Sequence, residues 1–211
     1  IALWDRKQKE LLISRDRYGI KPLYYALQGN KFYFGSEQKA ITAVTAFTKK
    51  LNKKALIEYL TFQNILTDQT LLEDICLLEP GKFASIKLNN HASKQISIDK
   101  VEYWNYHFQE PKGKTRKVEY VEELDRLFQQ AVKRQLVSDV EIGAYLSGGI
   151  DSGAIASLTA KQLPDLKTFT CGFDLSSASG IELNFDERVK AEAMSAKLRT
   201  EHYEMVLKAG D

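Results

Sequence analysis

Residues 147–152 read Ser-Gly-Gly-Ile-Asp-Ser, and this short polar loop restricts the fold of the chain more than any other feature. An apolar run, residues 142–146, precedes the loop, and a small-residue helical stretch, residues 153–163, follows it. The run is typical of a buried parallel strand, so we expect the order strand, loop, helix of an α/β sheet. Such loops hold anions, because a helix beginning near Asp151 adds unpaired backbone N–H groups and the positive end of its dipole.

The residue types in the loop favour a phosphate as the anion. Gly148 and Gly149 can adopt positive φ, so consecutive N–H groups can turn toward one centre that a phosphate approaches closely. Ser147 and Ser152 can donate hydroxyl hydrogen bonds to phosphate oxygens. Asp151 would repel a bare phosphate, which favours a Mg²⁺ ion between carboxylate and phosphate; helix capping by Asp151 is the alternative.

Two commoner phosphate-binding loops are excluded. A Walker A loop requires Gly-Lys-Ser or Gly-Lys-Thr after four variable residues, a dinucleotide fingerprint requires G-x-G-x-x-G, and residues 147–152 contain neither. What remains resembles the SGGxDS loop of the ATP pyrophosphatases, or PP-loop enzymes, which bind the β and γ phosphates while the α phosphate is attacked. An ordinary glycine-rich turn followed by a helix cap is the alternative.

Composition excludes several other classes of protein. The 30 basic and 28 acidic residues leave a net charge of +2, without the basic stripe that nucleic-acid binding favours. Only three histidines are present, which argues against a multi-histidine metal site. Cys76 and Cys171 lack metal spacing and are predicted to be reduced core thiols of a cytoplasmic protein. No apolar run reaches the ~18 residues of a membrane span, and no signal peptide is visible.

The first half of the chain is rich in predicted strands. We expect strands at residues 1–4, 10–15 and 82–88, and a hairpin that joins residues 24–27 to 31–35 through a tight polar turn. One helix, residues 53–64, is predicted with Asn52 as its N-cap and with an apolar face. The expected members of that face are Ala55, Leu56, Tyr59 and Leu60.

The second half predicts helices that alternate with strands. It follows a polar stretch with the composition of a linker, residues 109–116. Residues 118–137 predict an amphipathic helix whose acidic residues precede its basic ones, as the helix dipole favours. Its expected apolar face comprises Val121, Leu124, Phe128, Ala131 and Val132. Strands are expected at residues 142–146, 168–173 and 203–207, with helices at 153–163 and 185–199 between them, which predicts a parallel sheet.

A second motif lies near the start of the chain. Residues 15–25 read Arg-Asp-Arg-Tyr-Gly-Ile-Lys-Pro-Leu-Tyr-Tyr, and residues 35–40 read Gly-Ser-Glu-Gln-Lys-Ala. Together they look like the RDxxGxxPLYY…SExKA stretch of class II glutamine amidotransferase domains. From the residues alone we predict a structural ion pair between Arg15 and Asp16, because an Arg-Asp pair at a strand end more often orients backbone than performs chemistry.

The order of the two motifs resembles one family in particular, the glutamine-hydrolysing asparagine synthetases. The resemblance also covers residues 78–81, 103–104, 138–140 and 143–146. It implies an α+β first part, residues 1–110, which is the C-terminal portion of an N-terminal-nucleophile hydrolase sandwich in a class II amidotransferase domain. It implies an α/β second part, residues 111–211, which is the incomplete parallel-sheet PP-loop domain of a synthetase.

The resemblance also implies a reaction. A nucleophilic N-terminal cysteine releases ammonia from glutamine, and the synthetase domain uses ATP and Mg²⁺ to convert the aspartate side chain to β-aspartyl-AMP, with release of pyrophosphate. Ammonia then displaces AMP and gives asparagine. The implied partners are therefore the small molecules ATP, aspartate and glutamine. A homodimer is one open option for the assembly. From the composition we expect a cytoplasmic protein that binds neither nucleic acid nor membrane.

Individual residues of this chain match the nucleotide-binding positions of the family. The predicted ATP-binding residues are Leu146, Ser147, Gly148, Gly149, Asp151, Ser152 and Cys171. Among these the resemblance assigns Mg²⁺ to Asp151 and the adenine side to Cys171, at the carboxyl end of the next strand. A plain buried thiol is the equal alternative for Cys171. His202 is expected to introduce the last strand rather than to act as a base.

The sequence departs from the family pattern in several places. Gly153 stands where a second serine often follows the loop, and Cys171 replaces a more usual small or branched residue. The chain starts at Ile1 inside an apolar stretch and stops at Asp211 after an expected strand, so we interpret it as an internal piece. The nucleophilic cysteine and the glutamine- and aspartate-binding segments would then lie outside it. No catalytic residue is therefore assigned, and we expect the isolated chain to be inactive.

Two other functions stay open at this point. A relative could activate a different carboxylate, for example in amidation of a sugar acid or closure of a β-lactam. A truncated remnant could bind nucleotide, or a partner, without turnover. Retention of Asp151 and both loop glycines argues against complete loss of the site.

Overall fold

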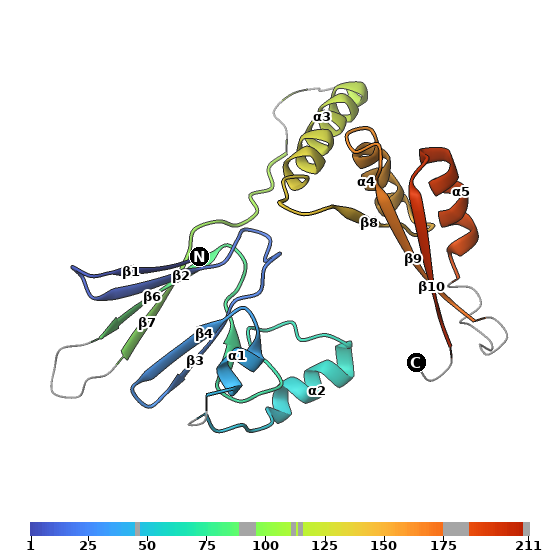
Figure 1. Ribbon diagram of the computed structural model, residues 1–211. Helices are drawn as coiled ribbons and strands as arrows, with labels where there is room; N and C mark the ends of the chain where they lie inside the picture. Colours follow the sequence, from blue (N-terminus) through green and yellow to red (C-terminus); the bar gives the residue numbers. More distant parts are fainter. Residues whose placement is uncertain (45–46, 89–95, 111–112, 114–115, 175–185, 209–211) are drawn as a thin grey trace. The chain divides into compact units, whose positions relative to one another are not determined.

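The computed structural model describes residues 1–44, 47–88, 96–110, 113, 116–174 and 186–208 (Figure 1). The chain divides into two compact units, residues 1–109 and 110–211. It is a mixed α/β protein with three sheets among the described residues. None of the helices in that part of the chain has the length and apolar character needed to cross a membrane.

Two antiparallel sheets build the first unit. One sheet has the order β1 (Ala2–Asp5), β2 (Glu10–Ser14), β6 (Lys82–Leu88) and β7 (Ile96–Glu102). The other has the order β4 (Lys31–Gly35), β3 (Tyr24–Gln28) and β5 (Ile75–Leu77). The predicted strands and the hairpin are confirmed, whereas β5 and β7 are strands that we did not predict. Ile13, Tyr25 and Leu78 share one buried cluster, so residues of both sheets contribute to the core.

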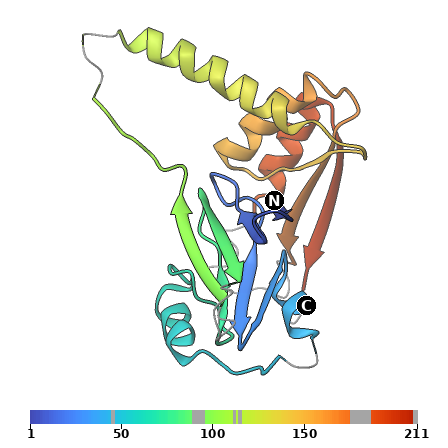
Figure 2. The same ribbon diagram turned by 90° about the vertical axis from the view of Figure 1, so that its left-hand side faces the viewer.

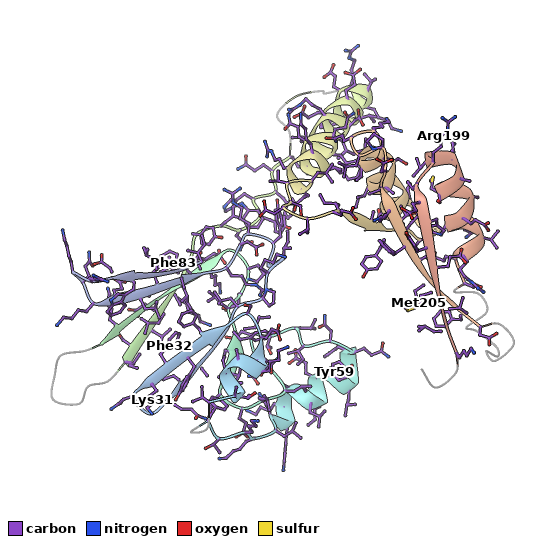
Figure 3. All side chains as sticks on the ribbon, in the orientation of Figure 1. Lys31, Phe32, Tyr59, Phe83, Arg199 and Met205 are labelled. Carbon is purple, nitrogen blue, oxygen red and sulfur yellow. The ribbon has the colours of Figure 1, made fainter. Side chains whose placement is uncertain are left out.

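Two short helices complete the first unit, α1 (Gln38–Thr42) and α2 (Lys53–Phe62). The predicted N-cap is confirmed, because Asn52 Oδ1 accepts hydrogen bonds from the N–H groups of Lys54 (3.1 Å) and Ala55 (3.2 Å). The predicted apolar face is only partly correct. Ala55 is buried, but Tyr59, labelled in Figure 3, and Leu60 are exposed. The reason is that the rest of the first unit packs against the first turn of α2 and leaves its later turns exposed.

The Arg15–Asp16 motif orients the backbone of a turn. Arg15 donates to the carbonyl oxygens of Gly19 (2.7 Å), Lys21 (3.1 Å) and Leu78 (2.7 Å). Asp16 accepts hydrogen bonds from three backbone N–H groups of the same turn, those of residues 18, 20 and 21. The expected ion pair between Arg15 and Asp16 is wrong, since each side chain bonds to backbone instead. The structural role that we predicted for the pair is consistent with these contacts.

The second unit is built on a parallel sheet with the order β10 (Glu201–Leu207), β9 (Lys167–Phe173) and β8 (Gly143–Tyr145). Its helices are α3 (Lys117–Gln135), α4 (Ile150–Ala160) and α5 (Arg188–Leu198). The predicted alternation and the parallel pairing are confirmed. In Figure 1, α4 lies beside β8, and α5 lies beside β9 and β10. Leu146, Ala156 and Ala191 form the buried cluster between this sheet and the two helices.

Two burial expectations for the second unit are wrong. The strand before the loop is at an edge of the sheet, and Tyr145 is 88% exposed because no described helix covers that face. Figure 3 labels Met205, which lies on the side of β10 away from α5 and is also exposed. Helix α3 runs beside α4 (Figure 2), but Val121 and Leu124 line an open hollow of about 590 Å³ between the two helices. Of its expected apolar face only Val132 is fully buried.

We predict that Asp16→Ala destabilises the first unit by about 1 kcal/mol, because three backbone N–H groups lose their acceptor. The hydrogen bond from Lys21 N–H is the main cause that lowers the pKa of Asp16. A lowered pKa means that this stabilisation is present above the ordinary carboxylate range and is lost as the pH falls through the folded-state pKa. Urea unfolding of wild type and variant should therefore converge at acid pH. Asp99→Ala, which removes an exposed carboxylate, is the control and should leave the unfolding midpoint unchanged at both pH values.

Candidate functional site

The candidate site lies at the carboxyl ends of β8 and β9. Tyr145 of β8 pairs with Phe169 of β9, and the Leu146 N–H donates to the Phe169 carbonyl oxygen at 2.8 Å, so the pairing continues to the residue before the loop. The loop, residues 147–149, then leads directly into α4. Strand β9 extends further in the same direction, which places Cys171 near the start of the loop. Ligands of open α/β sheets bind at this edge.

The two serines that we predicted as phosphate ligands are brought together. The hydroxyl oxygens of Ser147 and Ser152 lie 2.7 Å apart and share a hydrogen bond. Ser152 Oγ also accepts from the Ser147 N–H at 3.1 Å, and Ser147 Oγ accepts from the Gly149 N–H at 3.1 Å. Both hydroxyls therefore lie at the start of α4, beside the first N–H groups of that helix, which have no partner within the helix itself.

Asp151 lies in the first turn of α4 and does not cap it. The N-cap is Gly149, and its cap makes no side-chain hydrogen bond. The Asp151 carboxylate is exposed and makes no hydrogen bond or ion pair with any described residue. The capping alternative for Asp151 is therefore wrong. A free carboxylate beside the loop fits a single Mg²⁺ ligand, with phosphate oxygens and water in the other positions. The described residues contain no group of three or more His, Cys, Asp or Glu that could hold a metal alone.

The loop glycines are required for a reason different from the one expected. Neither Gly148 nor Gly149 adopts positive φ. A Cβ at Gly148 would instead lie 2.7 Å from Cδ and 3.1 Å from Cβ of Lys190, on α5. A Cβ at Gly149 would lie 3.2 Å from Ser147 Oγ. Glycine therefore permits the close approach of α5 and of the serine hydroxyl, rather than an unusual backbone conformation.

The side chains of Leu146 and Cys171 lie on opposite faces of the sheet. Leu146 is 1% exposed and packs in the core with Ala156 and Ala191, so a ligand at the edge reaches only its backbone. Along β9, Thr168 and Thr170 are buried whereas Cys171 is exposed. The buried-thiol alternative for Cys171 is therefore wrong. Cys171 lines a hollow of about 640 Å³ on the face away from α4 and α5.

The helix α5 was predicted, but sequence reasoning missed that its first residues also reach this edge. Arg188 pairs with Asp186 through three side-chain hydrogen bonds: Nε donates to Oδ1 at 2.9 Å and to Oδ2 at 3.1 Å, and Nη2 donates to Oδ2 at 2.6 Å. Its Nη2 also donates to the carbonyl oxygen of Phe173, the last residue of β9, at 3.0 Å. The hydrogen bond from Arg188 lowers the pKa of Asp186. Asp186, Arg188 and the Phe173 carbonyl oxygen thus form a clamp between α5 and the end of β9. The acid–acid–base order of residues 186–188, at the start of the helix predicted at 185–199, is the sequence signal that could have identified it.

His202 and Cys76, the other titratable residues discussed in the sequence, each contact residues of their own unit of the fold. His202 lies in β10, as predicted for a strand residue, and its Nδ1 is 2.9 Å from the Thr168 hydroxyl. Both cysteines are free, and Cys76 packs against the core of the first unit. Burial is the main cause that raises the pKa of the Cys76 thiol, which disfavours its reactive thiolate.

Comparison with known protein families accounts for both halves of the chain. Residues 1–104 match the glutamine amidotransferase domain family, and residues 123–211 match the asparagine synthase family. The chain belongs to the glutamine-hydrolysing asparagine synthetase family.

Several curated relatives of the chain are themselves named glutamine-hydrolyzing asparagine synthetases. The chain is 32% identical over 221 residues to asparagine synthetase (glutamine-hydrolyzing) 3 of Bacillus subtilis, which covers 100% of this chain and 34% of that protein. It is 32% identical over 181 residues to asparagine synthetase (glutamine-hydrolyzing) 1 of the same organism, covering 86% of this chain and 27% of the relative. Amidase chry2 of Gibberella zeae is 29% identical over 205 residues, or 94% of this chain and 29% of that protein. The chain thus spans 34% and 27% of the length of these two Bacillus subtilis relatives. It spans 39% of a putative asparagine synthetase (glutamine-hydrolyzing) 2 of Methanocaldococcus jannaschii.

The clamp of this asparagine synthetase family member can be tested with a pair of glycine variants. A Cβ at Gly172 would lie 2.5 Å from Arg188 Nε, so Gly172→Ala should displace the clamp and destabilise the second unit by about 2 kcal/mol. Gly153→Ala is the matched control, because Gly153 lies inside α4 and its Cβ would meet only the Met194 methyl, at 3.1 Å. The control should be neutral or up to about 1 kcal/mol stabilising. Urea unfolding measures both, and equal midpoints would show that the clamp is not rigid.

Proposed function

We propose that the chain forms the nucleotide-binding part of a ligase that makes asparagine from aspartate, ATP and glutamine-derived ammonia. The observation that carries this proposal is the Ser-Gly-Gly-Ile-Asp-Ser loop at the carboxyl end of β8, with both hydroxyls and the Asp151 carboxylate gathered at the start of α4. Family membership of both halves supports the assignment. In this proposal residues 1–110 belong to the amidotransferase domain, with an N-terminal-nucleophile hydrolase sandwich, and residues 111–211 to the PP-loop synthetase domain.

The chemistry requires activation before amide formation. A carboxylate resists attack by ammonia until it becomes a mixed anhydride with a good leaving group, and adenylation by ATP supplies that group. In this proposal residues 147–149 and Ser152 bind the pyrophosphate part of ATP. Donors placed where charge develops on the departing pyrophosphate would lower the barrier to adenylation.

The other proposed contacts follow from where each group lies. The Leu146 backbone contacts the nucleotide, since its side chain is buried. The exposed Cys171 lies along the adenine side. Asp151 would hold Mg²⁺, which shields the negative charge of the phosphates when it is bound. A homodimer stays one open option for the assembly.

A relative with another acceptor is the second candidate. Amidase chry2 matches 94% of this chain, and its name does not mention asparagine. The activated carboxylate of this protein could therefore belong to a substrate other than aspartate. The two candidates share the ATP site and differ only in the acceptor, so an acceptor-dependent assay separates them.

We predict that the complete gene product releases pyrophosphate from ATP with Mg²⁺ and ammonia only when aspartate is present. Asp151→Asn should lower kcat/KM at least about 100-fold, because the amide cannot replace a carboxylate ligand and the phosphate charge is left unshielded. Asp165→Asn, the same charge change in the turn between α4 and β9, is the control and should leave kcat/KM unchanged.

Each other outcome changes the assignment. Pyrophosphate release that depends on a different carboxylate would favour the second candidate. Tight ATP binding with no turnover on any acceptor would indicate a nucleotide-binding remnant. An Asp151→Asn variant as active as wild type would refute the metal role of Asp151.

A further inference from the structure

Lys190 of α5 lies against the proposed phosphate loop. The position of a Cβ on Gly148 is 2.7 Å from Lys190 Cδ, so the methylene stem of this lysine crosses the open side of the loop glycine. Lys190 is exposed and lies in the first turn of α5. No sequence motif pointed to it, because its proximity to the loop arises only from the packing of α5 against β9, β10 and α4.

The Lys190 ammonium is free whereas its neighbour on the same helix is not. The structure gives Lys190 no hydrogen bond and no ion pair with any described residue. Arg188, two residues earlier, is held by Asp186 and the Phe173 carbonyl oxygen. Of these two cations at the start of α5, Lys190 is the one that retains its donors for a ligand among the described residues.

An acidic neighbour increases the need for this cation. Glu187 Oε1 lies 3.4 Å from the same Cβ position on Gly148, so a carboxylate also borders the loop. Together with Asp151 it would oppose the approach of a polyphosphate. Glu187 and Lys190 make no ion pair within 4.0 Å, so the ammonium is not committed to the carboxylate.

We propose that Lys190 is a ligand of the pyrophosphate oxygens of a nucleoside triphosphate bound at residues 147–152. This inference rests on the proposed ATP site and adds a residue from a different element to it. A lysine binds phosphate as a compact point charge on a flexible stem, which suits a side chain that must reach over a glycine. Lys190 should therefore strengthen binding of ATP and of inorganic pyrophosphate, and it should not affect AMP, which lacks the β and γ phosphates.

The test compares matched lysine variants of the complete gene product. Dissociation constants of ATP, pyrophosphate and AMP, each with Mg²⁺, are measured by calorimetry at low salt. Lys190→Met keeps the apolar stem and should weaken ATP and pyrophosphate about 10-fold or more, as expected for loss of a charge-assisted contact, with AMP unchanged. Lys190→Arg should restore binding to within about 3-fold of wild type. Lys197→Met, an exposed lysine in the last turn of α5, is the control and should match wild type.

A double-mutant cycle with Glu187→Gln separates a phosphate contact from simple charge compensation. If Lys190 contacts phosphate, Lys190→Met weakens pyrophosphate binding in both the wild-type and the Glu187→Gln backgrounds. If the defect disappears in Glu187→Gln, Lys190 only offsets that carboxylate and the inference is overturned. Equal binding by wild type and Lys190→Met overturns it while leaving the ATP site intact. A wild-type protein that binds neither ATP nor pyrophosphate refutes the proposed function itself, and thermal unfolding confirms that each variant is folded.

Discussion

The parallel pairing of β8 with β9 is the interaction on which the candidate site depends. It continues through the Leu146 N–H, so the chain is held until the residue before the loop and is released directly into α4. A slip of one residue would exchange Tyr145 and Leu146 between the two faces of the sheet. Leu146 would then leave the core between the sheet and its helices. Burial of Leu146 thus fixes the point along β8 at which the loop begins, and with it the position of the serine hydroxyls.

Close packing of α5 provides the second constraint. Its first turn lies over Gly148 in the loop after β8 and over Gly172 near the end of β9, and a Cβ at either glycine would meet a basic side chain of α5. The same helix is tied to β9 by the bond from Arg188 to the Phe173 carbonyl oxygen. Loop, strand end and helix start therefore form one packed assembly, in which the absence of two Cβ atoms lets charged groups approach the edge of the sheet.

Local patterns were sufficient for most of the fold. Alternating apolar residues and polar turns predicted the hairpin of β3 and β4, and the Asn52 cap was predicted because capping depends only on residues a few positions away. The strand–helix order likewise predicted the parallel sheet. Burial was harder to predict: Tyr145 and Leu60 are exposed although local pattern favours burial, because burial depends on which other elements pack over a face, and no described element covers these two side chains. The positions of Arg188 and Lys190 depend on tertiary packing, so no motif near the loop indicated them.

The hydrogen bond between Ser147 and Ser152 limits what these hydroxyls can add to ligand affinity. Each hydroxyl has a single proton; one is used between the two oxygens, and Ser152 can place the other on the Gly149 carbonyl oxygen at 3.2 Å. A phosphate oxygen that accepts either hydroxyl proton must replace a hydrogen bond that the serine already makes. The total number of hydrogen bonds therefore hardly changes when the phosphate binds. The two serines would thus mainly orient the phosphate, and most of the binding free energy would come from the backbone N–H groups and from charged side chains.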